Sequence, residues 1–236
     1  MHAETETDTA SGQQAAARTA ADQAAMPIDV ISDVVCPWCY IGKRRLEKAL
    51  ASLPDIPVAL RWQPYQLDAT IPPQGKDRQQ YLMDKFGSQA RIDALHEQIA
   101  AAGLQEGIPF AFERIRTSPN TLDCHRLLLW SRADGLQSEM AERLFRLYFL
   151  EGADLSDPQT LVMAAGEVGM MADLVAELLP TDSDRSKITA AVEQAHRIGV
   201  TGVPAFIIDE RFIVMGAEKP ETLAAAIKHA YETKTG

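Results

Sequence analysis

The sequence is poor in cysteine, in aromatic residues and in long apolar runs. Only three of its 236 residues are cysteines, and 6% are aromatic. A secreted domain held together by disulfides usually carries more cysteines in a much shorter chain, so this class is not favoured. No apolar run approaches the roughly 20 residues that a membrane-spanning helix needs, so we expect no membrane association.

Positive charge is also scarce. The chain has 23 basic residues against 33 acidic ones, which gives a formal net charge of −10. Nucleic-acid binding needs a basic surface against the phosphates, so we expect no nucleic-acid partner. The length and the 46% of hydrophobic residues are enough for a sizeable core, in one large domain or two small ones.

Residues 1–26 are predicted to form a disordered tail that is acidic and rich in alanine. This segment has no apolar h-region, and its acidic residues outnumber its single arginine. Neither a secretory signal nor a mitochondrial transit peptide is therefore expected. We expect a cytoplasmic protein, in which stable disulfides are rare and a C-x-x-C pair is reactive or metal-binding.

Strand patterns are confined to the two ends of the chain. Residues 28–35 and 57–65 predict two strands with a helix between them, and 204–217 predicts a hairpin followed by a closing helix. The middle of the chain is helical in pattern. This arrangement predicts an α/β domain, residues 27–68 plus 195–236, interrupted by an all-helical insertion over 69–194.

Two local features of the helices carry predictions. The segment SPNTLDCHRLLLWSRADG predicts a helix capped by Ser118, with Pro119 in its first turn. Lys43, Arg44 and Arg45 are interpreted as a solvated helix face. Apolar stripes on the inserted helices face either a core or a second copy of the chain, so a homodimer is one arrangement that the pattern allows.

The segment DVVCPWCYIG contains a C-x-x-C pair just after the first predicted strand. Cys36 falls in the first turn of a helix, where unpaired N–H groups and the helix dipole favour a thiolate. Cys39 lies three residues on, on the same helical face. The pair can form a mixed disulfide through Cys36 and resolve it through Cys39. Pro37 suits the first turn, and Trp38 is expected at the surface beside the reactive sulfur.

A zinc site is the main alternative for this pair. Tetrahedral zinc needs four ligands, and one C-x-x-C supplies two. Cys124 and His125 are adjacent, so their side chains would point about 100° apart on a helix. The sequence has no second C-x-x-C and no H-x₃-H. Ligand counting therefore favours a redox pair, and no metal site is expected.

The segment TGVPAFII, residues 201–208, gives independent support for a redox site. A proline that enters a strand gives up a ladder hydrogen bond, so its position calls for an explanation. A cis Val203–Pro204 bond would expose the Val203 backbone for a substrate to pair with. The combination of this segment with the C-x-x-C favours the cis form.

Four segments together resemble a known family: SDVVCPWCYIGKRRLE, RWQPYQL, SPNTLDCHRL and AHRIGVTGVPAFIIDERFIVMGAEKPETL. The chain resembles the DsbA-type thioredoxin-fold oxidoreductases, and most closely the cytoplasmic FrnE-like group. The resemblance implies a thioredoxin-like fold interrupted by an inserted helical domain. It also implies that Cys36 is the nucleophile, Cys39 the resolving thiol, and Pro204 a cis-proline that faces the disulfide. Pro37, Trp38 and Val203 complete the expected substrate-binding residues.

Four further residues are weaker candidates for the site. Asp33 is interpreted as a solvated loop carboxylate, with a proton relay to Cys39 as the alternative. Asn120 and His125 lie on the segment that the resemblance places over the active site, and both are interpreted as ordinary helix residues. Cys124 departs from the small apolar residue that relatives often carry there, and is interpreted as a buried thiol, with a third redox thiol as the alternative.

Three functions are compatible with these patterns. Thiol–disulfide exchange, including isomerisation, on protein disulfides or small thiols is favoured, with glutathione as electron donor or co-substrate and no other cofactor. A glutathione-dependent isomerase or transferase of the kappa or hydroxychromene-carboxylate isomerase type is the alternative, although those enzymes typically have serine in place of Cys36. A redox-linked chaperone or binding protein is the third. The natural substrate and the direction of electron flow do not follow from the sequence.

Overall fold

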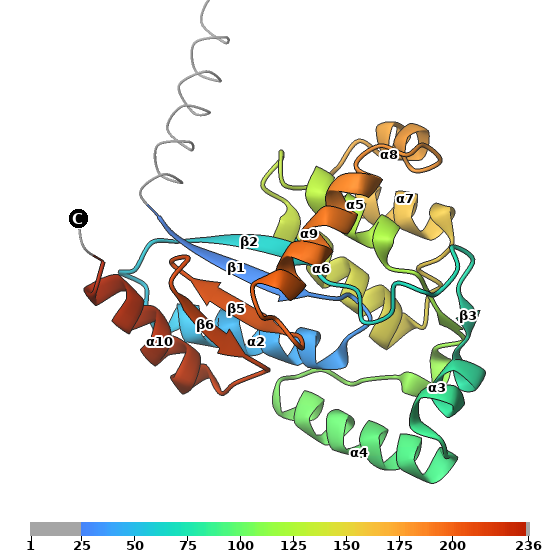
Figure 1. Cartoon of the computed structure of the whole chain (residues 1–236), viewed down its shortest axis with the longest axis horizontal. Helices are drawn as coiled ribbons and strands as arrows, with labels where there is room; N and C mark the ends of the chain where they lie inside the picture. Colours follow the sequence, from blue (N-terminus) through green and yellow to red (C-terminus); the bar gives the residue numbers. More distant parts are fainter. Residues whose placement is uncertain (1–24, 235–236) are drawn as a thin grey trace, which may run out of the picture.

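The computed structural model describes residues 25–234. Its main sheet has four strands in the order β2-β1-β5-β6. The strands are β1 (Met26–Ser32), β2 (Val58–Pro64), β5 (Ala205–Ile208) and β6 (Phe212–Met215). β1 and β2 run parallel, and the other two pairs are antiparallel. Figure 1 shows how the two ends of the chain meet in this sheet, as the sequence predicts.

Helices occupy most of the remaining chain (Figure 1). α2 (Pro37–Ala51) connects β1 to β2, and α10 (Pro220–Glu232) follows β6. Between β2 and β5 lie α3 (Arg78–Phe86), α4 (Gln89–Gln105), α5 (Leu122–Trp130), α6 (Gln137–Arg146), η2 (Leu147–Glu151), α7 (Pro158–Glu167), α8 (Ala172–Leu178) and α9 (Arg185–Arg197). A short turn, η1 (Phe112–Arg114), precedes α5. The insertion is not entirely helical, because β3 (Lys76–Asp77) and β4 (Thr117–Ser118) form a small antiparallel pair.

The alternation of side chains along β1 assigns the two faces of the sheet. Ile28 and Val30 belong to the main hydrophobic core, which also contains buried residues of α2 and α10. Ile31 points the other way and packs with Ala195 of α9 and with Val200. Both faces are thus covered by helices, as expected where a sheet contains a parallel pair.

The helices of the insertion pack directly against β2. Leu127 of α5 and Phe145 of α6 share the main core with Ile28. The Trp62 indole N–H on β2 donates to the Ser138 hydroxyl of α6 at 3.1 Å. The sheet and the inserted helices therefore share one core, and the division into two domains stays a prediction.

The basic residues that follow the C-x-x-C dock α2 onto the insertion. Lys43 is only 5% exposed, and its ammonium lies 2.9 Å from Glu142 of α6. Arg44 pairs with the same carboxylate, and Arg45 pairs with Glu106 at 2.7 Å. The prediction of a solvated face is wrong because acidic residues distant in sequence meet these cations.

Two predicted boundaries are also wrong. The predicted tail over 1–26 lies outside the described residues except at its end, where Met26 is buried and begins β1. The helix over SPNTLDCHRLLLW begins at Leu122 rather than near Ser118. A residue before proline is restricted to extended conformations, and Ser118 accordingly pairs with Lys76 in the β3–β4 ladder.

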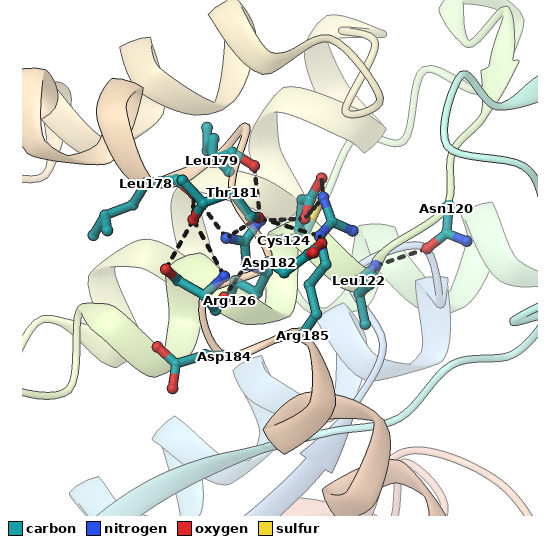
Figure 2. Close-up of polar contacts among 12 residues, drawn as sticks. Asn120, Leu122, Cys124, Arg126, Leu178, Leu179, Thr181, Asp182, Asp184 and Arg185 are labelled. Atoms are coloured by element: carbon teal, nitrogen blue, oxygen red, sulfur yellow. Dashed lines mark hydrogen bonds and ion pairs between the residues drawn. The ribbon is translucent and has the colours of Figure 1, made fainter.

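A fully buried arginine anchors α5, the helix that carries Cys124 and His125. The Arg126 guanidinium donates hydrogen bonds to four backbone carbonyls and to one carboxylate (Figure 2). The acceptors are the carbonyls of Ser183 at 2.7 Å, Leu178 and Leu179 at 2.9 Å and Thr181 at 3.0 Å, and Asp123 Oδ1 at 2.8 Å. The cation thus stabilises the carbonyl end of α8, where the helix dipole is negative.

Candidate active site

The two cysteines of the C-x-x-C lie at the start of α2. Cys36 is the N-cap residue with an extended backbone (φ −91°, ψ 112°), and Pro37 occupies the first turn. The Cys39 N–H donates to the Cys36 carbonyl at 3.0 Å, which closes the first helical turn. Both thiols are free and buried, with Cys36 4% and Cys39 1% exposed. The unpaired backbone N–H groups of the first turn of α2 therefore lie at the end of the helix that Cys36 caps.

The Val203–Pro204 segment faces Cys36 from the other end of the chain. Its peptide bond is cis, as the sequence analysis expects. Cys36 Sγ lies 3.6 Å from the Val203 carbonyl oxygen. A Cβ atom at Gly42 would lie 2.7 Å from Pro204 Cγ, so only glycine allows α2 to approach the proline this closely. The structure thus brings Cys36, Val203 and Pro204 together.

Cys39 lies deeper than Cys36 in the protein. Burial raises the pKa of the Cys39 thiol well above its usual value, and the neighbouring Cys36 raises it further. The Ser32 hydroxyl and the Asp33 backbone N–H offset part of this rise. Ser32 was not identified from the sequence. The sequence could have indicated Ser32 by its position at the end of the strand that precedes the C-x-x-C.

Asp33 is buried rather than solvated, so its interpretation as a loop carboxylate in water is wrong. The side chain is 1% exposed, and Oδ2 accepts a hydrogen bond from the Leu67 N–H at 2.8 Å. Oδ1 has no hydrogen-bond partner among residues 25–234 and lies 3.5 Å from His125 Nε2. His125 Nε2 donates to the Tyr65 carbonyl at 2.8 Å. The Asp33 carboxylate and the His125 imidazole are therefore buried side by side, between helix α5 and the loop that precedes Cys36.

The remaining candidates are placed differently. Asn120 accepts from the Leu122 N–H at 3.0 Å and donates to the Ile71 carbonyl, so it connects a loop to the start of α5. Cys124 is fully buried, and burial raises the pKa of its thiol well above the usual range. Trp38 is half-buried rather than at the surface.

A cavity of about 390 Å³ opens beside Cys36, Trp38 and Val203. Its walls include one face of α3 and one face of α4. The α3 residues are Arg78, Tyr81, Leu82, Lys85 and Phe86, and the α4 residues are Ile92, Leu95, His96 and Ile99. Helical spacing in the sequence indicates these faces, but it does not distinguish a cavity wall from a packed core.

The described part of the chain has neither a cluster of metal-binding side chains nor a membrane-spanning helix. Within residues 25–234, no group of three or more His, Cys, Asp or Glu side chains could hold a metal ion. No helix in the same range is long and apolar enough to cross a membrane.

Comparison with known proteins gives one family and several relatives. A family model described as a DSBA-like thioredoxin domain matches residues 27–228. The Bacillus subtilis protein YwbO is 26% identical over 211 residues, which cover 88% of this chain and 98% of YwbO.

Solved structures share the fold. The probable DsbA oxidoreductase SCO1869 from Streptomyces coelicolor has a TM-score of 0.83 and 30% identity, with 89% of this chain and 92% of that chain covered. The cytosolic disulfide reductase DsbM from Pseudomonas aeruginosa, in a structure with GSH, has a TM-score of 0.61 and 19% identity, with 87% and 99% covered. At that identity, the likeness to DsbM concerns the fold alone.

Proposed function

We propose a function from one premise: the chain belongs to the DSBA-like thioredoxin domain family. The proposed reaction is thiol–disulfide exchange by Cys36 and Cys39 on protein disulfides or small-molecule disulfides. One observation carries it: Cys36 caps α2 while Cys39, three residues on, is held behind it as a buried thiol.

In this proposal the two sulfurs have different parts in the reaction. The Cys36 thiolate attacks one sulfur of the substrate, which forms a mixed disulfide and releases the other sulfur as a thiolate. Cys39 then loses its proton and attacks Cys36 Sγ, which forms the Cys36–Cys39 disulfide and releases the second substrate thiolate. The dithiol loses two electrons and two protons, and the substrate gains them.

The surroundings of the pair support this sequence of steps. In the proposal, the Val203 and Pro204 backbone positions the substrate beside Cys36 Sγ, while Pro37 and Trp38 contact it from the helix side. The unpartnered oxygen of Asp33, beside His125, accepts the proton that leaves the buried thiol. Asn120 and Cys124 contact neither reactive sulfur in this proposal.

Recycling by glutathione in the cytoplasm completes the proposal. DsbM, a cytosolic disulfide reductase of the same fold, is described in a structure with GSH. Reduction of the Cys36–Cys39 disulfide by two glutathione molecules would return the dithiol and release oxidised glutathione. The protein would then act as a reductase or isomerase, with glutathione as its electron donor.

The Cys39→Ser variant tests the order of the two sulfurs. It is expected to accumulate a mixed disulfide between Cys36 and an oxidised substrate peptide, because no second thiol resolves it. Intact-protein mass spectrometry after acid quenching measures this species. In the wild-type protein its lifetime should shorten as pH rises, because the raised pKa of Cys39 leaves few thiolates at neutral pH.

One control variant accompanies this test. Cys124→Ser should resolve the mixed disulfide as the wild type does. If Cys39→Ser turns over without accumulation, or if the trapped peptide is attached to Cys124, the assigned roles are wrong.

A further inference from the structure

The cavity beside Cys36 has an apolar body and a cationic wall. Leu82 and Phe86 of α3 face Ile92, Leu95 and Ile99 of α4 across it. Its volume of about 390 Å³ lies within the usual range for small-molecule sites, which is about 300–1,000 Å³. Because Cys36 itself lines the cavity, a molecule bound there lies against the proposed nucleophile.

The cations on the α3 wall lack acidic partners. Arg78 donates to the Tyr148 hydroxyl at 2.8 Å, and Lys85 lies 3.1 Å from the Tyr81 hydroxyl. Neither forms an ion pair with a carboxylate among residues 25–234. A phenol hydroxyl does not neutralise either cation, and the half-buried position of Arg78 strengthens its attraction for an anion.

Two carboxylates also line the cavity, and neither forms an ion pair with Arg78 or Lys85 in the described part of the chain. Asp33 Oδ2 accepts from the Leu67 N–H at 2.8 Å, and Asp68 Oδ1 accepts from the Thr70 N–H at 2.9 Å. Against the effect of burial, the Thr70 hydrogen bonds and the charges of Lys76 and Lys85 lower the pKa of Asp68, so Asp68 offsets part of the charge of Lys85. His96 stacks on Phe112 with ring centroids 4.3 Å apart. Burial and the nearby Arg78 lower the pKa of His96, so it is mainly neutral at neutral pH.

We infer that the cavity binds a small aromatic or branched aliphatic disulfide that carries a carboxylate. Its sulfur meets Cys36, its apolar body lies between α3 and α4, and its carboxylate meets Arg78 and Lys85. This inference rests on the proposed function and names its substrate class. Exchange releases the two halves of the disulfide as thiols while the Cys36–Cys39 disulfide forms. The dithiol loses two electrons and two protons, and the two halves gain them.

The test compares two aromatic disulfides that differ only in charge, para-dithiodibenzoate and para-dithiodibenzamide. The second-order rate constant for oxidation of the reduced protein is measured for each by stopped flow. The wild type should favour the carboxylate probe. Lys85→Gln should lower the carboxylate-to-amide ratio by about two- to fivefold, because the ammonium is exposed. Arg78→Gln should lower it by about tenfold, because this cation is less exposed.

A matched control removes a distant charge. Lys228→Gln on α10, where Lys228 pairs with Glu232 at 3.8 Å, should leave the ratio unchanged. Damage to the fold would lower the rate constants of both probes, whereas loss of charge recognition would lower only that of the carboxylate probe, so the ratio separates the two effects. Equal ratios in wild type, Lys85→Gln and Arg78→Gln would overturn the inferred class of substrate while exchange itself continues.

Calorimetry of the Cys36→Ser protein measures ligand binding in the absence of disulfide exchange. Naphthoate should bind more tightly than the neutral naphthamide, and Arg78→Gln in this background should reduce the difference by about tenfold. Tight naphthoate binding with no exchange in the wild type would support the cavity and overturn the proposed function. Exchange without any naphthoate binding would overturn the cavity assignment alone.

Discussion

The Cys36→Ser variant is expected to lose thiol–disulfide exchange by at least about a thousandfold. A serine hydroxyl at the α2 N-cap is almost entirely protonated at neutral pH, whereas a thiolate is the attacking species in exchange. Cys39 does not replace it, because burial raises the pKa of its thiol and removes it from contact with substrate. The turnover rate with an insulin or glutathione-disulfide substrate measures the loss.

Cys124→Ser is the matched control for this experiment. Cys124 is also a buried thiol, but its Sγ faces the Leu155 carbonyl at 3.9 Å rather than the Val203 segment. Its variant should keep exchange within about twofold of the wild type, because surroundings rather than residue type decide reactivity. Normal rates in Cys36→Ser, or equal losses in both variants, would contradict the assignment of the nucleophile.

Replacement of Arg126 by methionine is expected to reduce the free energy of unfolding by about 3–5 kcal/mol. Methionine fills much of the space but donates no hydrogen bond. The Leu178, Leu179 and Thr181 carbonyls then lose a partner; the hydrogen bond to Leu179 is buried and the other two are partly buried. Unsatisfied buried acceptors are costly. Chemical denaturation monitored by circular dichroism measures the change.

Two further variants make the Arg126 prediction specific. Arg126→Lys keeps the charge but not the planar fork of donors, so it should recover only part of the stability. Arg132→Met removes an exposed arginine just beyond α5 and should change stability by less than about 0.5 kcal/mol. A loss of less than about 1 kcal/mol in Arg126→Met would show that the carbonyl contacts contribute little.

Residues close in sequence could be placed from the sequence alone. The C-x-x-C pair, the strand before it and the helix after it lie in one continuous segment, so spacing was enough to place Cys36 at a helix start. The cis Val203–Pro204 bond is predicted from the combination of the Gly-Val-Pro segment with the C-x-x-C, because cis is rare for an X–Pro bond without such support. The hairpin between β5 and β6 was likewise set by local pattern.

Features that depend on contacts between distant segments could not be placed. The burial of Asp33 depends on Leu67 and His125, and that of Lys43 depends on Glu142. Charged residues are rarely buried without such partners, so a solvated position is the reasonable expectation for each. The cavity depends in the same way on how α3 and α4 stand relative to α2.

A redox titration of the Cys36–Cys39 pair tests the central claim most directly. The protein is equilibrated in glutathione buffers of graded potential, Trp38 fluorescence is recorded with Trp38→Phe as control, and free thiols are counted by alkylation. The dithiol mechanism predicts a reversible two-electron transition in which Cys36 and Cys39 become unreactive together while Cys124 does not change. No transition, with tight glutathione binding instead, would contradict the dithiol mechanism and favour a glutathione-dependent isomerase or transferase.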